Sequence, residues 1–157
     1  MKRLKLALVI LLFAGLMIGC VLGSVRFPTP SEGYQPKVKY KISYDKMWNI
    51  IDDVLESNRI NIASQDKQKG ITVTEYIQGQ TETMGPLGTI QTRYKYNIKL
   101  KKDENATTKL AIICNFESSG NKMHAWREIS ADNKERVEKL EKWLYEQIEK
   151  KLNGNNK

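Results

Sequence analysis

The chain has 157 residues, of which 26 are Lys or Arg and 18 are Asp or Glu, so its formal net charge at pH 7 is +8. This length accommodates one domain of modest size. A single histidine excludes a His-rich metal cluster, and two cysteines exclude a disulfide-rich framework. The sequence has no Gly-rich phosphate loop and no zinc-ligand spacing, so we expect neither a metal nor another cofactor.

The first 20 residues have the layout of a secretory signal. An unbroken apolar run over residues 6–18 follows three basic residues, Lys2, Arg3 and Lys5. The sequence Leu-Met-Ile-Gly-Cys over residues 16–20 resembles the lipobox of bacterial lipoproteins, although that family usually has leucine where this chain has methionine. The resemblance implies cleavage after residue 19 and attachment of acyl chains to Cys20.

Two other interpretations of this segment stay open. Residues 6–22 lie near the lower limit of the roughly 17–25 apolar residues that a spanning helix needs, which leaves room for an uncleaved anchor. The ordinary signal peptidase is the other route, although Ile18 and Leu22 disfavour its small-residue pattern. If Cys20 is acylated, the valine that follows it, rather than aspartate, favours sorting to the outer membrane in a cell with two membranes, by resemblance to lipoproteins of such cells.

The segment behind Cys20 predicts a tether. Residues 20–37 contain Pro28, Pro30 and Pro36, a composition typical of extended, poorly packed chain. We therefore expect a signal peptide over residues 1–19, a lipidated tether over residues 20–37, one folded domain over residues 38–153 and a disordered tail over residues 154–157. Because the protein is expected to be exported and lipid-anchored, we expect no nucleic-acid partner for the positive charge.

The first half of the domain predicts a strand, a helix and a hairpin. Residues 38–43 alternate with period two, and Ser43 is an expected helix N-cap. An apolar stripe then predicts an amphipathic helix over residues 44–56, formed by Tyr44, Met47, Trp48, Ile51, Val54 and Leu55. Strands over residues 60–63 and 71–77 are expected to form a hairpin, and residues 78–88 are predicted to be a loop.

The second half predicts two long strands and a closing helix. Residues 89–101 and 109–117 alternate, and residues 119–130 are predicted to be a connection. A helix capped by Ser130 or Asp132 follows, with a buried stripe of Val137, Leu140, Leu144, Ile148 and Leu152. We expect an α+β fold, in which an antiparallel sheet of about four to six strands packs against an N-terminal helix and a long C-terminal helix.

Two groups of residues are candidates for binding a partner. Arg93, Lys95 and Lys99 share one face of the strand over residues 89–101, where they could meet a membrane, an acidic protein or an envelope polymer, or form an ordinary solvent face. Trp126 and Arg127 lie in the predicted connection, and both residue types dominate the energetics of protein interfaces. Cys114 lies in an apolar run and is expected to be a buried small hydrophobe.

The helix over residues 44–56 and the following hairpin resemble the opening of a BamC-type repeat. The shared pattern is an aromatic-bearing helix, a strand, an Asp…Gly turn and a second strand, carried here by Trp48, Ile60, Asp66, Gly70 and Val73 among others. Such repeats occur in lipoproteins of the outer-membrane protein assembly machinery. The resemblance, over about residues 38–152, implies a helix-grip fold with a curved sheet around the C-terminal helix, although this chain has only one such domain.

These features favour a non-enzymatic envelope lipoprotein that acts as an interaction or scaffold module in outer-membrane assembly or maintenance. Its expected partners are a membrane, through Cys20, and other envelope proteins. A carrier of lipid or another small apolar ligand is the alternative hypothesis. In that case a cavity between the sheet and the C-terminal helix would be lined by Tyr94, Tyr96, Phe116 and Trp143.

Overall fold

The computed structural model describes residues 38–83, 88–104, 106–120 and 123–154. Every described residue belongs to one compact unit, Gly33–Lys157. The predicted signal segment, Cys20, the tether and residues 155–157 of the predicted tail lie outside the described residues. Within the described part of the chain, neither helix is long and apolar enough to cross a bilayer.

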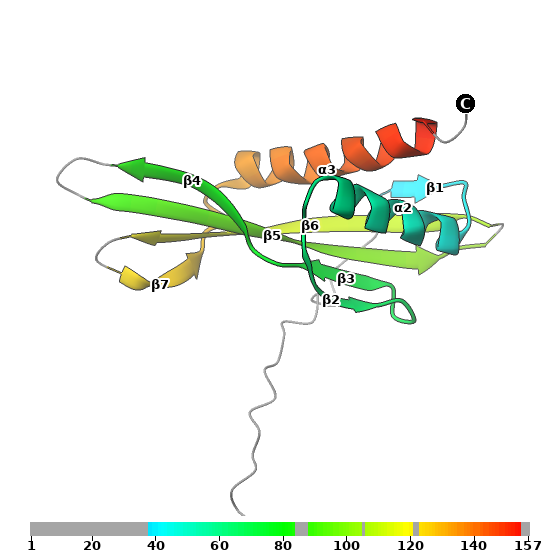
Figure 1. Cartoon of the computed structure of the whole chain (residues 1–157), viewed down its shortest axis with the longest axis horizontal. Coiled ribbons are helices and arrows are strands. Elements are labelled where there is room, and N and C mark those ends of the chain that lie inside the picture. Colours follow the sequence, from blue (N-terminus) through cyan, green and yellow to red (C-terminus); the bar gives the residue numbers. More distant parts are fainter. Residues whose placement is uncertain (1–37, 84–87, 105, 121–122, 155–157) are drawn as a thin grey trace, which may run out of the picture. The chain divides into compact units, whose positions relative to one another are not determined.

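A seven-stranded antiparallel sheet is built around one long hairpin (Figure 1). The hairpin consists of β5 (Thr89–Lys102) and β6 (Thr108–Gly120), which pair without a break from Ile90 opposite Gly120 to Lys102 opposite Thr108. Four strands flank it: β3 (Ile71–Thr74) and β4 (Ile77–Thr83) pair with β5, and β1 (Val38–Tyr40) and β7 (Met123–Glu128) pair with β6. The seventh strand, β2 (Ile62–Asp66), pairs with β3.

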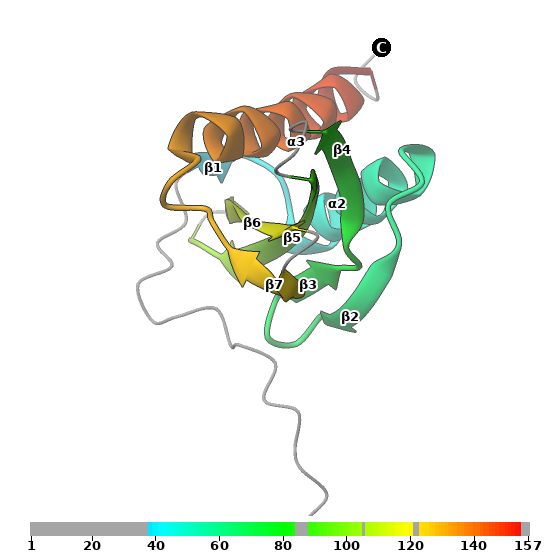
Figure 2. The same ribbon diagram turned by 90° about the vertical axis from the view of Figure 1, so that its left-hand side faces the viewer.

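Both helices cover the same face of the hairpin (Figure 2). The hydroxyl of Ser43 caps α2 (Tyr44–Ser57) by accepting the backbone N–H of Lys46 at 3.4 Å. The longer helix, α3 (Lys134–Gly154), runs above the sheet. The core lies between these layers and includes Met47, Ile51, Val54 and Leu55 of α2, Leu144 and Ile148 of α3, and Tyr96, Ile98, Leu110, Ile112 and Cys114 of the hairpin.

The outer edge of β6 between β1 and β7 is closed by side chains of the C-terminal segment. The backbone N–H of Ile112 donates to the Tyr145 hydroxyl oxygen at 3.0 Å, and that of Cys114 donates to Oε1 of Glu141 at 3.1 Å. The N–H of Phe116 donates to Oγ of Ser130 at 2.9 Å. Helix α3 therefore supplies hydrogen bonds that a further strand would otherwise make.

The structure confirms the α+β class, the antiparallel sheet and the two packed helices. The predicted stripes of both helices face the core, although Val137 and Leu140 are only half-buried. Cys114 is 1 % exposed, and burial, with the nearby Glu141 carboxylate second, raises the pKa of its thiol to about 12. The expectation that Cys114 is a buried small hydrophobe is confirmed.

The number of strands was predicted wrongly, because β4 and β7 were expected to be loop and connection. Residues 78–83 show no hydrophobic alternation, and their glycine favoured a loop. That glycine instead permits the pairing, since a Cβ at Gly79 would collide with Oγ1 of Thr92 on β5. The Thr92 hydroxyl in turn donates to the Gln80 carbonyl at 2.9 Å.

Several element boundaries also differ from prediction. β1 ends at Tyr40 rather than at residue 43, and β2 begins at Ile62 rather than at residue 60. The C-terminal helix begins at Lys134, so neither Ser130 nor Asp132 directly precedes it. The Ser130 hydroxyl instead accepts the backbone N–H of Phe116 on β6 and donates to the carbonyl of the same residue.

Candidate functional site

The face of the hairpin opposite the helices carries the predicted basic residues. We define this helix-free face by alternate residues of the two paired strands: Arg93, Lys95, Asn97, Lys99 and Lys101 on β5, and Lys109, Ala111, Ile113, Asn115 and Glu117 on β6. Their neighbours in the chain, such as Tyr96 and Ile112, point into the core. The structure thus places Arg93, Lys95 and Lys99 together.

Arg93 lies between two aromatic rings. Its guanidinium carbon is 3.8 Å from the centroid of the Tyr76 ring and 4.1 Å from that of Trp126. Tyr76 lies between β3 and β4, and Trp126 lies on β7, so this stack joins both flanks of the hairpin. Cation–π contacts of this kind are worth about 0.5–2 kcal/mol each.

Glu117 completes the stack from the neighbouring strand. Its Oε2 accepts from Nε of Arg93 at 2.8 Å and lies 2.7 Å from Nη2, while Oε1 accepts from the Tyr76 hydroxyl at 2.6 Å. The side chains of Arg93 and Glu117 are only 22 % and 16 % exposed, so this pair is shielded from solvent. Burial, followed by the hydrogen bond to Glu117, raises the pKa of Tyr76 to about 12.

Trp126 was predicted to lie in a connection between elements, and this is wrong. It lies on β7 and is half-buried against Arg93, so its ring already has a partner within the chain. Arg127, the next residue, is exposed. Sequence reasoning missed Tyr76 and Glu117, although the pairing of Arg93 with Glu117 follows once the two long strands are aligned in register.

A row of lysines continues along β5 from this stack. The ammonium of Lys95 is 4.7 Å from the Tyr76 ring centroid, and no acidic partner lies within ion-pair distance of Lys95, Lys99 or Lys101 among the described residues. Ala111, opposite Lys99, is only 3 % exposed although it faces away from the helices. Long lysine stems cover such small residues while their charged heads stay in solvent.

The helix-free face combines positive charge with partly covered apolar surface. Ile71 and Val73 of β3 lie beside Lys99 and Asn97, and all four side chains are half-buried. Such a surface can bind an acidic partner with shape and charge complementarity. Among the described residues, no group of three or more His, Cys, Asp or Glu side chains is arranged to hold a metal ion.

Comparison with models of protein families identifies the family of this chain. Residues 36–140 match the model of a family described as the outer membrane protein assembly factor BamC-like N-terminal domain. The chain belongs to this family. The match extends from just before β1 to the first part of α3, and it confirms the predicted BamC-like resemblance over that range. A search of curated proteins gave no match.

The space between sheet and helix in this BamC-like domain is occupied by aromatic side chains. Tyr96 and Phe116 are at most 1 % exposed, and the Tyr96 hydroxyl donates to the Leu140 carbonyl of α3 at 3.1 Å. The Arg136 guanidinium carbon lies 4.9 Å from the centroid of the Phe116 ring. A ligand bound there would have to displace these contacts, and the carrier hypothesis stays a prediction.

Replacing Arg93 tests whether the stack holds the two flanks of the sheet together. Arg93→Ala leaves the shielded Glu117 carboxylate without its ion-pair partner, so we expect the free energy of unfolding to fall by about 1–3 kcal/mol. Lys99→Ala, on the same strand and face, is the matched control and should change it by less than about 0.5 kcal/mol. Urea unfolding of both variants measures the difference, and equal losses would contradict the assignment.

Proposed function

We propose that this protein is a non-enzymatic, lipid-anchored envelope protein whose helix-free face binds another envelope protein during outer-membrane protein assembly. Membership of the BamC-like family supports the process. The observation that carries the binding role is the row of lysines beside the Arg93 stack, on a sheet face that neither helix covers, where Lys95, Lys99 and Lys101 have no ion pair with any described residue. Positive charge on that face favours a partner with acidic residues.

Anchoring at Cys20 would keep the domain near the membrane surface. Two or more acyl chains hold a protein stably, whereas a single chain binds only marginally. The Pro-rich tether over residues 20–37 would then let the domain move above the surface and present its basic face to neighbouring proteins. In a cell with two membranes, the proposed location is the periplasmic side of the outer membrane.

Lipid attachment is tested by metabolic labelling. Radiolabelled fatty acid should enter the wild-type chain and not Cys20→Ala, because acylation requires the thiol. Gel fluorography of the immunoprecipitated proteins makes the comparison, with Cys114→Ala as the matched control that should still be labelled. Equal labelling of the wild type and Cys20→Ala would contradict the proposal.

Partner binding is tested by photocrosslinking in cells that produce the full chain. A photoreactive phenylalanine analogue replaces Lys99 on the helix-free face or, as a control, the exposed Lys142 on α3. We expect the first position to crosslink to a component of outer-membrane protein assembly, identified by mass spectrometry, and the second not to do so. The same products from both positions, or none from position 99, would overturn the proposed binding face.

A further inference from the structure

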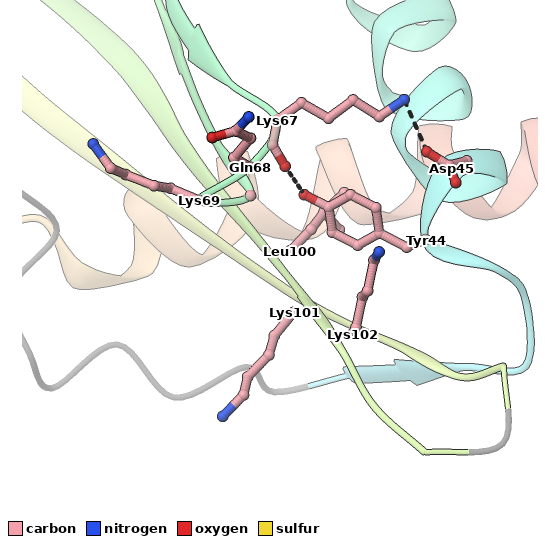
Figure 3. A pocket seen from close by; sticks show the side chains of 9 residues that line it. Tyr44, Asp45, Lys67, Gln68, Lys69, Leu100, Lys101 and Lys102 are labelled. Carbon is pink, nitrogen blue, oxygen red and sulfur yellow. Dashed lines mark hydrogen bonds and ion pairs between the residues drawn. The ribbon is translucent and has the colours of Figure 1, made fainter.

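Figure 3 shows a hollow of about 710 Å³. The β5 residues that line it, Leu100, Lys101 and Lys102, lie at the C-terminal end of that strand, away from Arg93. Three segments that are distant in the sequence form the hollow: the start of α2, the turn between β2 and β3, and the end of β5. Its volume falls within the roughly 300–1,000 Å³ of small-ligand sites. The lining residues on which the argument depends are Tyr44, Lys67, Lys69, Gly70, Lys101 and Lys102.

Hydrogen bonds between the three segments fix the shape of this hollow. The Tyr44 hydroxyl donates to the Lys67 carbonyl at 2.5 Å, and the N–H of Leu100 donates to the Gly70 carbonyl at 2.7 Å. Gly70 has a φ of +70°, and a Cβ there would collide with the Leu100 carbonyl oxygen, so only glycine fits this close approach. Because these contacts join all three segments, the hollow is formed before any ligand binds.

Positive charge is in excess around the hollow. Lys67 pairs with Asp45 at 2.9 Å and Lys69 pairs with Asp66 at 3.2 Å, whereas Lys101 and Lys102 have no ion pair in the described part of the chain. Figure 3 shows Lys102 directed toward the Tyr44 ring, 5.2 Å from its centroid, and Lys101 extending outward from the rim. The N-terminal end of α2 adds partial positive charge at the same place.

We propose that this hollow binds a phosphate group. Lysine ammonium groups act as point charges that bind phosphate oxygens, and two of the four lysines here form no ion pair with a carboxylate in the described part of the chain. Lys102 would contact the phosphate inside the hollow, and Lys101 would contact it at the rim. The phosphate can belong to a free ion or to the headgroup of an anionic lipid, and the two sources are separated experimentally.

The first measurement follows binding of two defined probes to the chain from residue 21 onward, which contains every residue that the structure describes. Sodium phosphate is titrated while amide NMR shifts of Gly70 and Lys102 are recorded, with sodium chloride as the reference salt. In parallel, the protein is sedimented with phosphatidylcholine vesicles that contain or lack phosphatidylglycerol. Saturable shifts with phosphate indicate the free ion, and vesicle binding without them indicates the lipid headgroup.

The second measurement separates the hollow from general surface charge. The double variant Lys101→Gln/Lys102→Gln should bind the effective probe about twenty-five-fold more weakly, since each removed lysine costs a factor of about five. Lys142→Gln/Lys150→Gln removes the same charge from α3 and should weaken binding less than about threefold. All four lysines are exposed, so circular dichroism melting should confirm that both variants fold.

Two results would overturn the phosphate site. One is that neither probe binds the wild-type chain. The other is that the two double variants weaken binding equally, because general attraction rather than the hollow would then account for it. Lys102→Arg keeps the charge and should retain most of the affinity. None of these outcomes depends on crosslinking at position 99, so the phosphate site and the proposed protein partner fail independently.

Discussion

The unpaired edge of β6 constrains the rest of this structure. Between Leu110, which still faces β1, and Glu117, where β7 begins to pair, no strand of the described chain pairs with the outer side of β6. Three of its N–H groups in this interval belong to Ile112, Cys114 and Phe116, all of which are buried. Leaving such a donor unsatisfied costs about 1–3 kcal/mol, so the fold needs polar atoms along this edge.

The C-terminal segment supplies these acceptor atoms, and the same hydrogen bonds hold the segment against β6. Tyr145 and Glu141, four residues apart on α3, lie on one side of the helix and reach alternate N–H groups of β6. That spacing sets α3 along the edge, where Leu144 and Ile148 complete the core. Burial of Tyr145 raises the pKa of its hydroxyl, even though the hydrogen bond from Ile112 acts in the opposite direction.

The two faces of the hairpin acquire different roles because both helices lie on one of them. On the covered face, residues such as Tyr96 and Ile112 form the core. On the other face, Arg93 contacts aromatic rings from both flanks, and Lys95, Lys99 and Lys101 have no ion pair among the described residues. Hydrophobic alternation along the two long strands predicted both faces of the hairpin from the sequence. The apolar stripes of the two helices predicted which sides of those helices face the core. The pairing of β4 and β7 depends instead on the register with β5 and β6, and Gly79 and Trp126 acquire their roles only through those contacts. The residue pattern within one segment carries no information about its pairing with another strand.

Hydrogen exchange at Ile112 tests the role of α3 most directly. Tyr145→Phe removes the only atom of that side chain that accepts the Ile112 N–H, and leaves the ring in place. The amide of Ile112 should then exchange about tenfold faster or more, while the amide of Cys114, bonded to Glu141, changes much less. Unchanged exchange at Ile112, or an equal increase at both amides, would contradict the account that side chains of α3 complete the edge of the sheet.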